Sequence, residues 1–413
     1  MESYLVRKIK NAGHFIRAVA AVVLYGFPAK RIKIIGITGT SGKTTTAHLV
    51  YEIFKSAGKK VALISTISAV INGETIDTGL HVTTPSSYHL QKLLKKALKF
   101  QTEYVVLEVT SHALDQYRTL GIPIDAGVIT NITHEHLDYH RTFGKYREAK
   151  EKILKNNRVS ILNYDDRNFQ YLKSKVKGKL VTFGKSKNAS VNPSTLKIKL
   201  NFPGEFNEEN ALAGAAVSLV YGIDVKTIEK AIKNFITLPG RMEEVPNRRG
   251  FKIVIDFAHK PDALKKVLLT ARDITKRKVI VVFGCAGLRD TEKRSMMGEI
   301  AATYSDFAVF TAEDPRTEDV KEIIRQIANG AACKGMVELR KSAKIRRRAK
   351  KINYFFRIPD RSEAIDFTIN TLAKPDDIVF FCGKGHEKSM CFGTKEYGWD
   401  ERKTVQKALG KRI

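Results

Sequence analysis

The sequence has 413 residues, enough for two or three domains that each bury a core of their own. Hydrophobic residues make up 43% and charged residues 28%, the balance of a soluble globular protein. The four cysteines (Cys285, Cys333, Cys382 and Cys391) lack the close Cys-x-x-Cys spacing of a zinc site, so the sequence suggests neither a zinc site nor a disulfide framework, and reduced cytosolic thiols are expected.

The formal net charge is +29, a value typical of partners of nucleic acid or anionic membranes. The basic residues are nevertheless scattered, and no nucleic-acid-binding motif interleaves them. We therefore favour a lysine-rich surface that suits phosphorylated substrates, and we expect no nucleic-acid partner. The densest cluster, residues 346–351, is predicted to lie in a solvated loop or on a helix face.

Residues 1–32 predict an apolar helix flanked by basic residues. Its apolar stretch, residues 14–27, is shorter than the ~18–20 residues that cross a bilayer. No small-residue cleavage site precedes the folded body, so a signal peptide is not expected. Two interpretations stay open: a helix docked on the next domain, which we favour, and a helix lying on a membrane surface.

From residue 33 onward, apolar strand-like runs alternate with helical patterns, which predicts a parallel α/β architecture. The predicted strands are Lys33–Thr38, Lys60–Ile67, Tyr104–Val109, Ala126–Asn131 and Val159–Asn163. The predicted helices include Thr45–Ala57, Ser86–Leu98, Asn207–Tyr221 and Val225–Phe235. Residues 191–202 alternate with period two, which predicts an antiparallel strand.

The turn signal Thr237-Leu238-Pro239-Gly240 predicts a domain boundary. After it the alternation restarts, with strands predicted at Lys252–Asp256, Lys278–Phe283, Phe307–Thr311, Tyr354–Ile358 and Asp377–Cys382. The helices between them include Pro261–Asp273, Asp319–Ala332 and Ser362–Leu372. The predicted organisation is an N-terminal helix (1–32), a central P-loop ATPase domain with a parallel sheet (33–238), and a smaller Rossmann-like C-terminal α/β domain (239–413).

A phosphate-binding loop follows the first strand. Gly39-Thr40-Ser41-Gly42-Lys43-Thr44 lies between that strand and a helix that begins at Thr45. In such a loop, backbone N–H groups and the helix N-terminus bind phosphate oxygens, the lysine reaches the β- and γ-phosphates, and the threonine hydroxyl can ligate Mg²⁺. Ile37 stands where a Walker A motif has its first glycine, which indicates a shorter variant of the loop. Glu108 ends a strand that a parallel sheet would bring beside this loop, where its carboxylate could ligate the cation.

Further motifs follow in one order along the chain. They are Thr83-Thr84-Pro85, Glu108 to Leu114 with Gln116 and Arg118, Thr130-Asn131, His136 to His140, Tyr146 to Lys150, Asn207 with Asn210, Gly240-Arg241, Asp256 to His259, Phe283-Gly284-Cys285 with Arg289-Asp290, Glu313 to Arg316, and Gly383 to Glu387. From about Ile35 to the C-terminus, this ordered set resembles the Mur ligases of peptidoglycan synthesis. Within that family it is most similar to the group that adds the third residue of the stem peptide.

The resemblance implies a reaction and its catalytic residues. ATP would phosphorylate the terminal carboxylate of UDP-N-acetylmuramoyl-L-alanyl-D-glutamate, and an amino acid would attack the acyl phosphate. The implied catalytic residues are Lys43, Glu108, His136 and Lys150. The implied Mg²⁺ ligands are Thr44, Glu108, His136 and Lys150, the last as N6-carboxylysine, because a neutral lysine amine can capture CO₂ and present carbamate oxygens.

The resemblance also implies three binding sets. ATP would be bound by the phosphate loop with Thr45, Asn210, Arg241 and His259, where Arg241 could reach ATP only once the domains close. The muramoyl dipeptide would be bound by Thr83, Thr84, Thr110, Ser111, Gln116 and Arg118. The incoming amino acid would be bound by Arg289, Glu313, Asp314, Pro315, Arg316, Gly383 and Glu387.

The third binding set bears on which amino acid is added. Relatives that add meso-2,6-diaminopimelate carry Asp-Asn-Pro-Arg, and lysine-adding relatives lack the arginine. This chain has Glu313-Asp314-Pro315-Arg316, so the arginine is kept and the first two residues differ. Guanidinium groups suit a distal carboxylate and repel the ammonium of lysine. We favour diaminopimelate over lysine on this ground.

The main departure from the family lies at the N-terminus. Only 35 residues precede Gly36, so we expect no counterpart of the uridine-binding domain that ordinary members carry. A soluble nucleotide acceptor held more weakly, or a domain supplied by a partner, is our first hypothesis. A lipid-linked muramoyl peptide at the inner membrane face is the second.

Three rival functions remain compatible with parts of the sequence. They are a folylpolyglutamate-synthetase-like ligase, a nucleic-acid-stimulated P-loop NTPase and a catalytically silent scaffold. The motif Thr83-Thr84-Pro85 argues against the first, and the presence together of the four implied catalytic residues argues against the last. We expect a cytoplasmic monomer with, at most, weak membrane association through residues 14–27.

Overall fold

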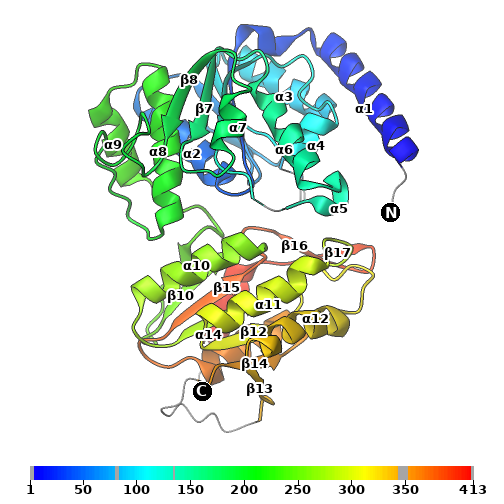
Figure 1. The fold of residues 1–413 in the computed structure, drawn as a ribbon, viewed down its shortest axis with the longest axis vertical. Coiled ribbons are helices and arrows are strands. Elements are labelled where there is room, and N and C mark those ends of the chain that lie inside the picture. Colours follow the sequence, from blue (N-terminus) through cyan, green and yellow to red (C-terminus); the bar gives the residue numbers. More distant parts are fainter. Residues whose placement is uncertain (1–3, 80–82, 134, 343–351, 411–413) are drawn as a thin grey trace. The chain divides into compact units, whose positions relative to one another are not determined.

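The computed structural model describes residues 4–79, 83–133, 135–342 and 352–410. The basic cluster at 346–351 lies outside these residues. The chain forms two compact units (Figure 1). The first holds the described residues up to Ile236 except Phe202–Gly204, and the second holds Phe202–Gly204 and the described residues from Thr237 onward. Each unit is a mostly parallel sheet with helices, so the predicted α/β fold class is confirmed.

The sheet of the first unit has eight strands in the order β4-β3-β2-β5-β1-β6-β7-β8. From β2 to β8 in that order every neighbouring pair is parallel, while β3 and β4 are added antiparallel at one edge. The strands are β1 Lys33–Thr38, β2 Val61–Ile64, β3 Ala69–Ile71, β4 Glu74–Ile76, β5 Tyr104–Glu108, β6 Ile124–Ile129, β7 Val159–Asn163 and β8 Lys179–Phe183.

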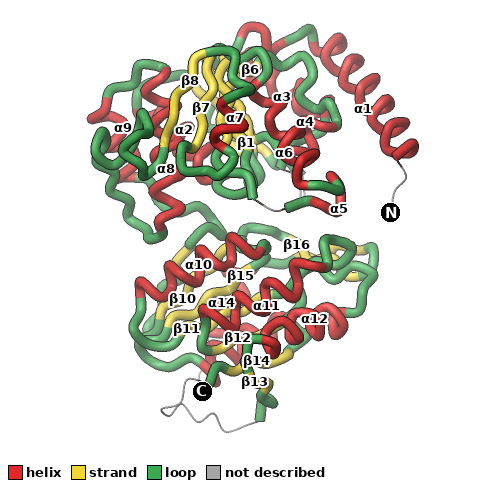
Figure 2. Tube along the Cα trace, in the orientation of Figure 1, coloured by secondary structure: helices red, strands yellow, loops and turns green. Residues whose placement is uncertain are grey.

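Helices cover both faces of this sheet, as the continuous burial of β5 and β7 requires. A core cluster joins one face to α3, α4, α6 and α7, while α2 packs with α8 and α9 (Figure 2). The helices are α1 Tyr4–Tyr25, α2 Lys43–Ser56, α3 Ser87–Lys99, α4 Ser111–Asp115, α5 Leu137–His140, α6 Phe143–Glu151, α7 Phe169–Lys173, α8 Glu205–Val220 and α9 Val225–Asn234, with 3-10 turns at Pro28–Arg31 and Lys152–Leu154. No helix among the described residues is long and apolar enough to cross a membrane.

The second unit has a seven-stranded sheet in the order β13-β14-β12-β11-β15-β10-β9, parallel except for β9. One of its faces shares a core with α13 and α14, and β16 and β17 form a separate hairpin. The strands are β9 Glu243–Glu244, β10 Lys252–Asp256, β11 Val279–Phe283, β12 Phe307–Phe310, β13 Val337–Glu338, β14 Tyr354–Arg357, β15 Ile378–Cys382, β16 Ser389–Phe392 and β17 Lys395–Gly398. The helices are α10 Pro261–Ile274, α11 Glu292–Tyr304, α12 Val320–Cys333, α13 Arg361–Phe367 continued by a π-turn at Thr368–Leu372, and α14 Glu401–Gly410.

The antiparallel strand predicted at residues 191–202 is wrong. This described segment makes one isolated bridge, between Val191 and Phe183, and is otherwise irregular. Asn192 closes a turn instead, because its side-chain oxygen accepts the N–H of Ser194 at 2.8 Å and its carbonyl accepts the N–H of Thr195 at 3.0 Å. Pro193 has no N–H to donate to a sheet, so the local turn chemistry outweighs the period-two pattern.

Candidate functional site

The phosphate loop leaves β1 at the carboxyl edge of the sheet and leads directly into α2. Gly42 caps that helix with φ 83°, and a β-carbon there would lie 2.2 Å from Oδ1 of Asn210 on α8. Only glycine fits such a position without strain. The N-terminal turn of α2, with Lys43, Thr44 and Thr45, therefore begins where the loop ends, and the first N–H groups of a helix form a natural anion site.

The segment after β6 holds the loop in shape. The N–H of Thr40 donates to the Asn131 carbonyl at 2.8 Å, and the N–H of Ser41 donates to Asn131 Oδ1 at 2.9 Å. Thr130 Oγ1 in turn donates to the Ser41 carbonyl at 2.7 Å. The sequence-based prediction assigns no separate role to Thr130-Asn131. These residues directly follow a buried strand of the same parallel sheet, and that position could have indicated a role at the loop.

Glu108 ends β5, the strand paired with β1, and Ile37 lies opposite it in the ladder. Its Oε1 accepts a hydrogen bond from the Thr44 hydroxyl at 3.0 Å, and its Oε2 accepts one from the Thr66 N–H at 3.0 Å. The structure therefore brings together two of the predicted cation ligands. A carboxylate and a hydroxyl at the end of a phosphate loop are the oxygen donors that Mg²⁺ prefers.

Lys150 on α6 is almost wholly buried, at 2% exposure, which is rare for a lysine side chain. Its Nζ donates to the Gly39 carbonyl at 2.7 Å and lies 3.5 Å from Thr38 Oγ1. Lys43 Nζ donates to the same Gly39 carbonyl at 3.0 Å. The two predicted catalytic lysines, far apart in sequence, thus share one carbonyl of the phosphate loop.

His136 caps α5 in a left-handed conformation, with φ 54°. Its ring lies 4.8 Å from the His112 ring and 6.0 Å from the Tyr146 ring. Lys150 Nζ lies 4.8 Å from the centroid of the Tyr146 ring, and the Tyr146 hydroxyl is 3.0 Å from Thr40 Oγ1. Burial raises the pKa of Tyr146, so its hydroxyl stays neutral and can donate a hydrogen bond. Tyr146 therefore links the histidine to the phosphate loop.

The donor chemistry around the loop fits a hard cation. The described residues contain no group of three or more histidine, cysteine and acidic side chains that could hold a metal by themselves. The predicted ligand set is of another kind, because Thr44 contributes a hydroxyl and Lys150 would contribute oxygens only after carbamylation. The contact between Thr44 and Glu108 provides the part of this set that is already assembled.

Four of the predicted acceptor-binding residues form one hydrogen-bonded group around α4. Thr84 Oγ1 donates to the Glu108 carbonyl at 3.0 Å and accepts the N–H of Thr110 at 3.0 Å. Arg118 donates to the Thr84 carbonyl at 2.7 Å and to Gln116 Oε1 at 2.7 Å, and burial lowers its pKa. The group is therefore tied to β5, the strand that ends in Glu108.

The other two predicted acceptor-binding residues lie beside this group. Ser111 Oγ lies 3.0 Å from Nε2 of the buried His140. Thr83 is half-buried next to Thr84. His140 belongs to the His136 to His140 motif, so the predicted acceptor-binding residue Ser111 and the histidine motif are in direct contact.

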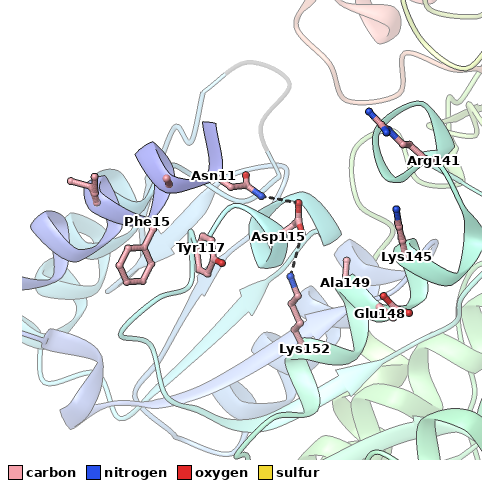
Figure 3. Close-up of a pocket in the computed structure, with 11 residues that line it drawn as sticks. Asn11, Phe15, Asp115, Tyr117, Arg141, Lys145, Glu148, Ala149 and Lys152 are labelled. Carbon is pink, nitrogen blue, oxygen red and sulfur yellow. Dashed lines mark hydrogen bonds and ion pairs between the residues drawn. The ribbon is translucent and has the colours of Figure 1, made fainter. Parts of the chain in front are cut away.

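A cavity of about 850 Å³ is lined by residues from α1, from α6 and from either side of Gln116 (Figure 3). Its lining includes Asp115, which accepts hydrogen bonds from the Tyr139 hydroxyl at 3.0 Å and from Asn11 of α1 at 3.4 Å, and pairs with Lys152 at 3.2 Å. Phe15 of α1 meets Tyr117 edge to face, with ring centroids 5.4 Å apart. The helix α1 therefore forms one wall of the cavity.

In the second unit, Arg241 and His259 lie around one aromatic ring. The Arg241 guanidinium is 4.7 Å from the Phe257 ring centroid, and the His259 ring is 4.4 Å from it. His386 approaches the same ring at 4.9 Å. Burial lowers the pKa of His259, and burial, aided by Arg241, lowers that of His386 to about 3. Both imidazoles are therefore neutral at pH 7, which suits contact with a neutral aromatic base.

The predicted amino-acid residues lie at the carboxyl edge of the second sheet. Lys384 Nζ, fully buried, bridges Asp314 Oδ1 at 2.9 Å and Glu387 Oε2 at 2.6 Å. Burial opposes its charge, but the two carboxylates outweigh burial and raise its pKa. The sequence-based prediction assigns no role to Lys384, although the acidic residues of the two neighbouring motifs indicate a cationic partner.

Glu313 differs from its neighbours because its buried Oε2 has no hydrogen-bond partner among the described residues. A β-carbon on Gly383 would lie 2.7 Å from that oxygen, so a glycine at 383 keeps the room that the carboxyl occupies. Burial is the main cause that raises the pKa of Glu313 to about 7. A carboxyl group that titrates near neutrality therefore lies in the predicted amino-acid site.

Arg316 and the loop of Arg289 meet at Gly287. Arg316 adopts φ 51°, and its Nη1 donates to the Gly287 carbonyl at 2.7 Å. The Gly287 N–H donates to the carbonyl of Asp314 at 2.8 Å, so the loop is fixed on the motif that follows β12. Pro315, between Asp314 and Arg316 in the sequence, is buried. Arg289, two residues after Gly287, is exposed. The two segments that carry the guanidinium groups are thus adjacent.

Comparisons with known proteins agree with this geometry. Residues 37–218 match the Mur ligase middle domain, and residues 240–385 match the Mur ligase, glutamate ligase domain. The UDP-N-acetylmuramoyl-L-alanyl-D-glutamate--2,6-diaminopimelate ligase 1 of Clostridium acetobutylicum is 36% identical over 417 residues, covering 96% of this chain and 82% of that protein.

Solved structures support the same fold. A UDP-N-acetylmuramoyl-L-alanyl-D-glutamate--2,6-diaminopimelate ligase has a TM-score of 0.61 at 28% identity, covering 92% of this chain and 79% of that one. The MurF ligase of Thermotoga maritima, solved in complex with ADP, has a TM-score of 0.66 at 18% identity, covering 95% of this chain and 83% of that one, and at this identity it supports the fold alone.

Proposed function

The chain belongs to the Mur ligase family of ATP-dependent amide ligases, and from that premise we propose that it adds meso-2,6-diaminopimelate to UDP-N-acetylmuramoyl-L-alanyl-D-glutamate. The observation that carries the proposal is the cluster at the phosphate loop. There, buried Lys150 contacts the Gly39 carbonyl and Thr44 contacts Glu108. We place the reaction in the cytoplasm, where ATP is available.

The first step transfers the γ-phosphoryl group of ATP to the terminal carboxylate of the acceptor, and ADP leaves. Both reacting groups are anionic, so the site must offset their repulsion. The Lys43 ammonium and the N-terminus of α2 lie at the loop that would hold the phosphates. Thr44, Glu108, His136 and carbamylated Lys150 would hold Mg²⁺, which would supply further positive charge against this repulsion.

In the second step the amine nitrogen attacks the acyl carbon, a proton leaves the nitrogen, and inorganic phosphate departs. The amine must arrive neutral and well oriented. We assign Arg316 and Arg289 to the distal carboxylate of the amino acid, because a guanidinium group matches a carboxylate with two parallel hydrogen bonds. We assign Glu387, held in place by Lys384, to its distal ammonium.

The nucleotide base is assigned to the ring cluster of the second unit. Phe257 offers an apolar surface, and His259 is neutral at pH 7 because burial lowers its pKa. Arg241 completes the cluster with a positive charge suited to a phosphate. On the first unit, Asn210 lies against Gly42 and contacts Thr46 at 3.4 Å, so it supports the loop from the side of α8.

The test is phosphate release by the purified protein with ATP, Mg²⁺ and UDP-N-acetylmuramoyl-L-alanyl-D-glutamate across a panel of amines. We expect meso-diaminopimelate to stimulate release most and L-lysine at least tenfold less, since one charged hydrogen-bonded contact is worth about 1.5–3 kcal/mol. Stimulation by lysine alone would move the assignment to a lysine-adding ligase. Release that no amine stimulates would overturn the proposed function.

A further inference from the structure

The N-terminal helix α1 has one face that the first unit covers. Ala18, Ala21 and Val22 are buried at 0%, 1% and 4% exposure, and α1 packs on α3. Gly121 leaves room for this contact, because a β-carbon there would lie 2.7 Å from Val22. The Tyr25 and Tyr88 rings meet edge to face at 5.1 Å. These contacts determine which side of α1 faces the first unit and which side faces away from it.

The opposite side, which we call the outer face, consists of Ile16, Val19, Ala20, Val23 and Leu24. Spacings of three and four residues place these side chains in one stripe along the helix. Ile16, Val23 and Leu24 are 67%, 62% and 64% exposed, and Ile16 also borders the cavity that Phe15 and Asp115 line. Single exposed apolar residues are ordinary, but a continuous stripe of this kind indicates a surface that binds something apolar.

The charge around the outer face restricts what that partner can be. No acidic residue occurs between Glu2 and Glu52, while basic residues occur throughout this segment. Arg17 lies on the helix, and Lys30 and Arg31 follow it; all three are exposed. An apolar stripe on a helix that carries Arg17, and that Lys30 and Arg31 follow, matches the acyl chains and anionic headgroups of a bilayer surface. A protein partner would need a strongly acidic rim around an apolar groove.

We propose that the outer face of α1 docks the protein on an anionic lipid bilayer, with the helix lying in the plane of the headgroups. The opposite face stays packed on α3, so docking requires no unfolding. Asn11 and Phe15 of the same helix contact Asp115 and Tyr117 next to the acceptor-binding residues. Docking therefore holds the edge of the unit that bears Gln116 and Arg118 close to the lipid surface. The proposal does not depend on which amino acid the protein adds.

The experiment is cosedimentation of the full chain with vesicles of phosphatidylglycerol and phosphatidylcholine, and with vesicles of phosphatidylcholine alone. The test variant is Ile16→Ser, Val23→Ser and Leu24→Ser together. Its matched control replaces three exposed apolar residues elsewhere, Val225→Ser, Ile236→Ser and Leu269→Ser. Analytical ultracentrifugation of each protein without vesicles measures self-association.

We expect the unmodified chain and the control to bind anionic vesicles at least tenfold more tightly than neutral ones, and the test variant to lose at least tenfold of that affinity. Absence of vesicle binding would overturn the proposal. Equal binding by the test variant would overturn it too, since the +29 charge alone would then explain adsorption. Self-association that the test variant abolishes, without vesicle binding, would assign the outer face to a second copy of the chain instead.

A charge-reversal pair checks the cationic border separately. Arg17→Glu, Lys30→Glu and Arg31→Glu together should weaken binding to anionic vesicles strongly. Lys226→Glu, Lys230→Glu and Lys233→Glu make the same change in net charge on α9, at the same number of exposed sites. The first variant should lose at least tenfold more affinity than the second. Equal losses would contradict a docking surface at α1.

Discussion

Replacing Glu313 with glutamine should stabilise the second unit at alkaline pH and leave its stability nearly unchanged in acid. The carboxyl group of Glu313 is buried, and its Oε2 has no hydrogen-bond partner among the described residues. Burial raises its pKa from 4.5 to about 7. Glutamine has almost the same shape and carries no charge, so it mimics the protonated form at every pH.

The expected magnitude follows from that pKa difference. A carboxyl group whose pKa is higher in the folded state favours folding below its unfolded pKa of 4.5, and that contribution is lost as the pH rises through about 7. At ~1.4 kcal/mol for each pH unit, the full loss is about 3 kcal/mol. The glutamine variant should therefore gain about 3 kcal/mol over the unmodified protein between pH 4.5 and pH 8.

The assay is urea unfolding at several pH values, followed by tryptophan fluorescence. Trp399 is the only tryptophan in the chain, and it lies in the second unit, where its Nε1 donates to Glu401 at 2.7 Å. Its fluorescence therefore reports on that unit. Glu299→Gln on α11 serves as the control, because Glu299 is half-exposed and pairs with Lys334 on the surface at 3.6 Å.

The diagnostic quantity is the difference in free energy of unfolding between the Glu313→Gln variant and the unmodified protein. His386, whose pKa burial lowers to about 3, makes an opposite contribution that rises with pH, and it is present in both proteins. A difference that stays constant from pH 4.5 to pH 8, as expected for Glu299→Gln, would show that Glu313 is not a desolvated carboxyl group and would refute this interpretation.

Three further predictions concern the site. Gly42→Ala should raise the KM for ATP at least tenfold and lower the free energy of unfolding of the first unit by about 1–2 kcal/mol, because φ is 83° and Asn210 blocks the β-carbon. Steady-state kinetics and thermal unfolding measure the two effects, and an unchanged KM would contradict the role of the loop. Lys150→Ala should lower phosphate release at least a hundredfold and recover part of it with added formate as a carboxylate substitute, whereas full activity would rule out the carbamate. Arg316→Ala should raise the KM for the amine ~10–100-fold without changing the KM for ATP. The control, Arg340→Ala at an exposed position, should change neither KM. A change in the KM for ATP alone would contradict the assignment of Arg316 to the amino acid.

The parts of the fold that are predictable from sequence are those whose pattern is local. The strand at Lys33–Thr38 and the phosphate loop after it are recognisable because an apolar run, two glycines and a helix start follow one another directly. The segment at 191–202 is mispredicted for a related reason. Its period-two pattern is also local, but Asn192 and Pro193 impose a turn within it.

Features of the site that depend on residues far apart in the sequence are harder to predict from the sequence. Sequence places Glu108 at the end of a strand, but the order of strands in the sheet decides that this strand pairs with β1. Lys150 is one of 72 basic residues, and only the fold shows that it is buried against the Gly39 carbonyl. The role of Lys384 is likewise visible only in the fold, where it pairs with Asp314, which lies 70 positions away in the chain.

The identity of the product tests the proposed ligase activity most directly. The protein is incubated with ATP, Mg²⁺, UDP-N-acetylmuramoyl-L-alanyl-D-glutamate and equal amounts of meso-diaminopimelate and L-lysine, and the nucleotide products are identified by mass spectrometry. We predict an ATP-dependent product whose mass equals the acceptor plus diaminopimelate less one water. Absence of any ATP-dependent adduct would contradict the ligase assignment.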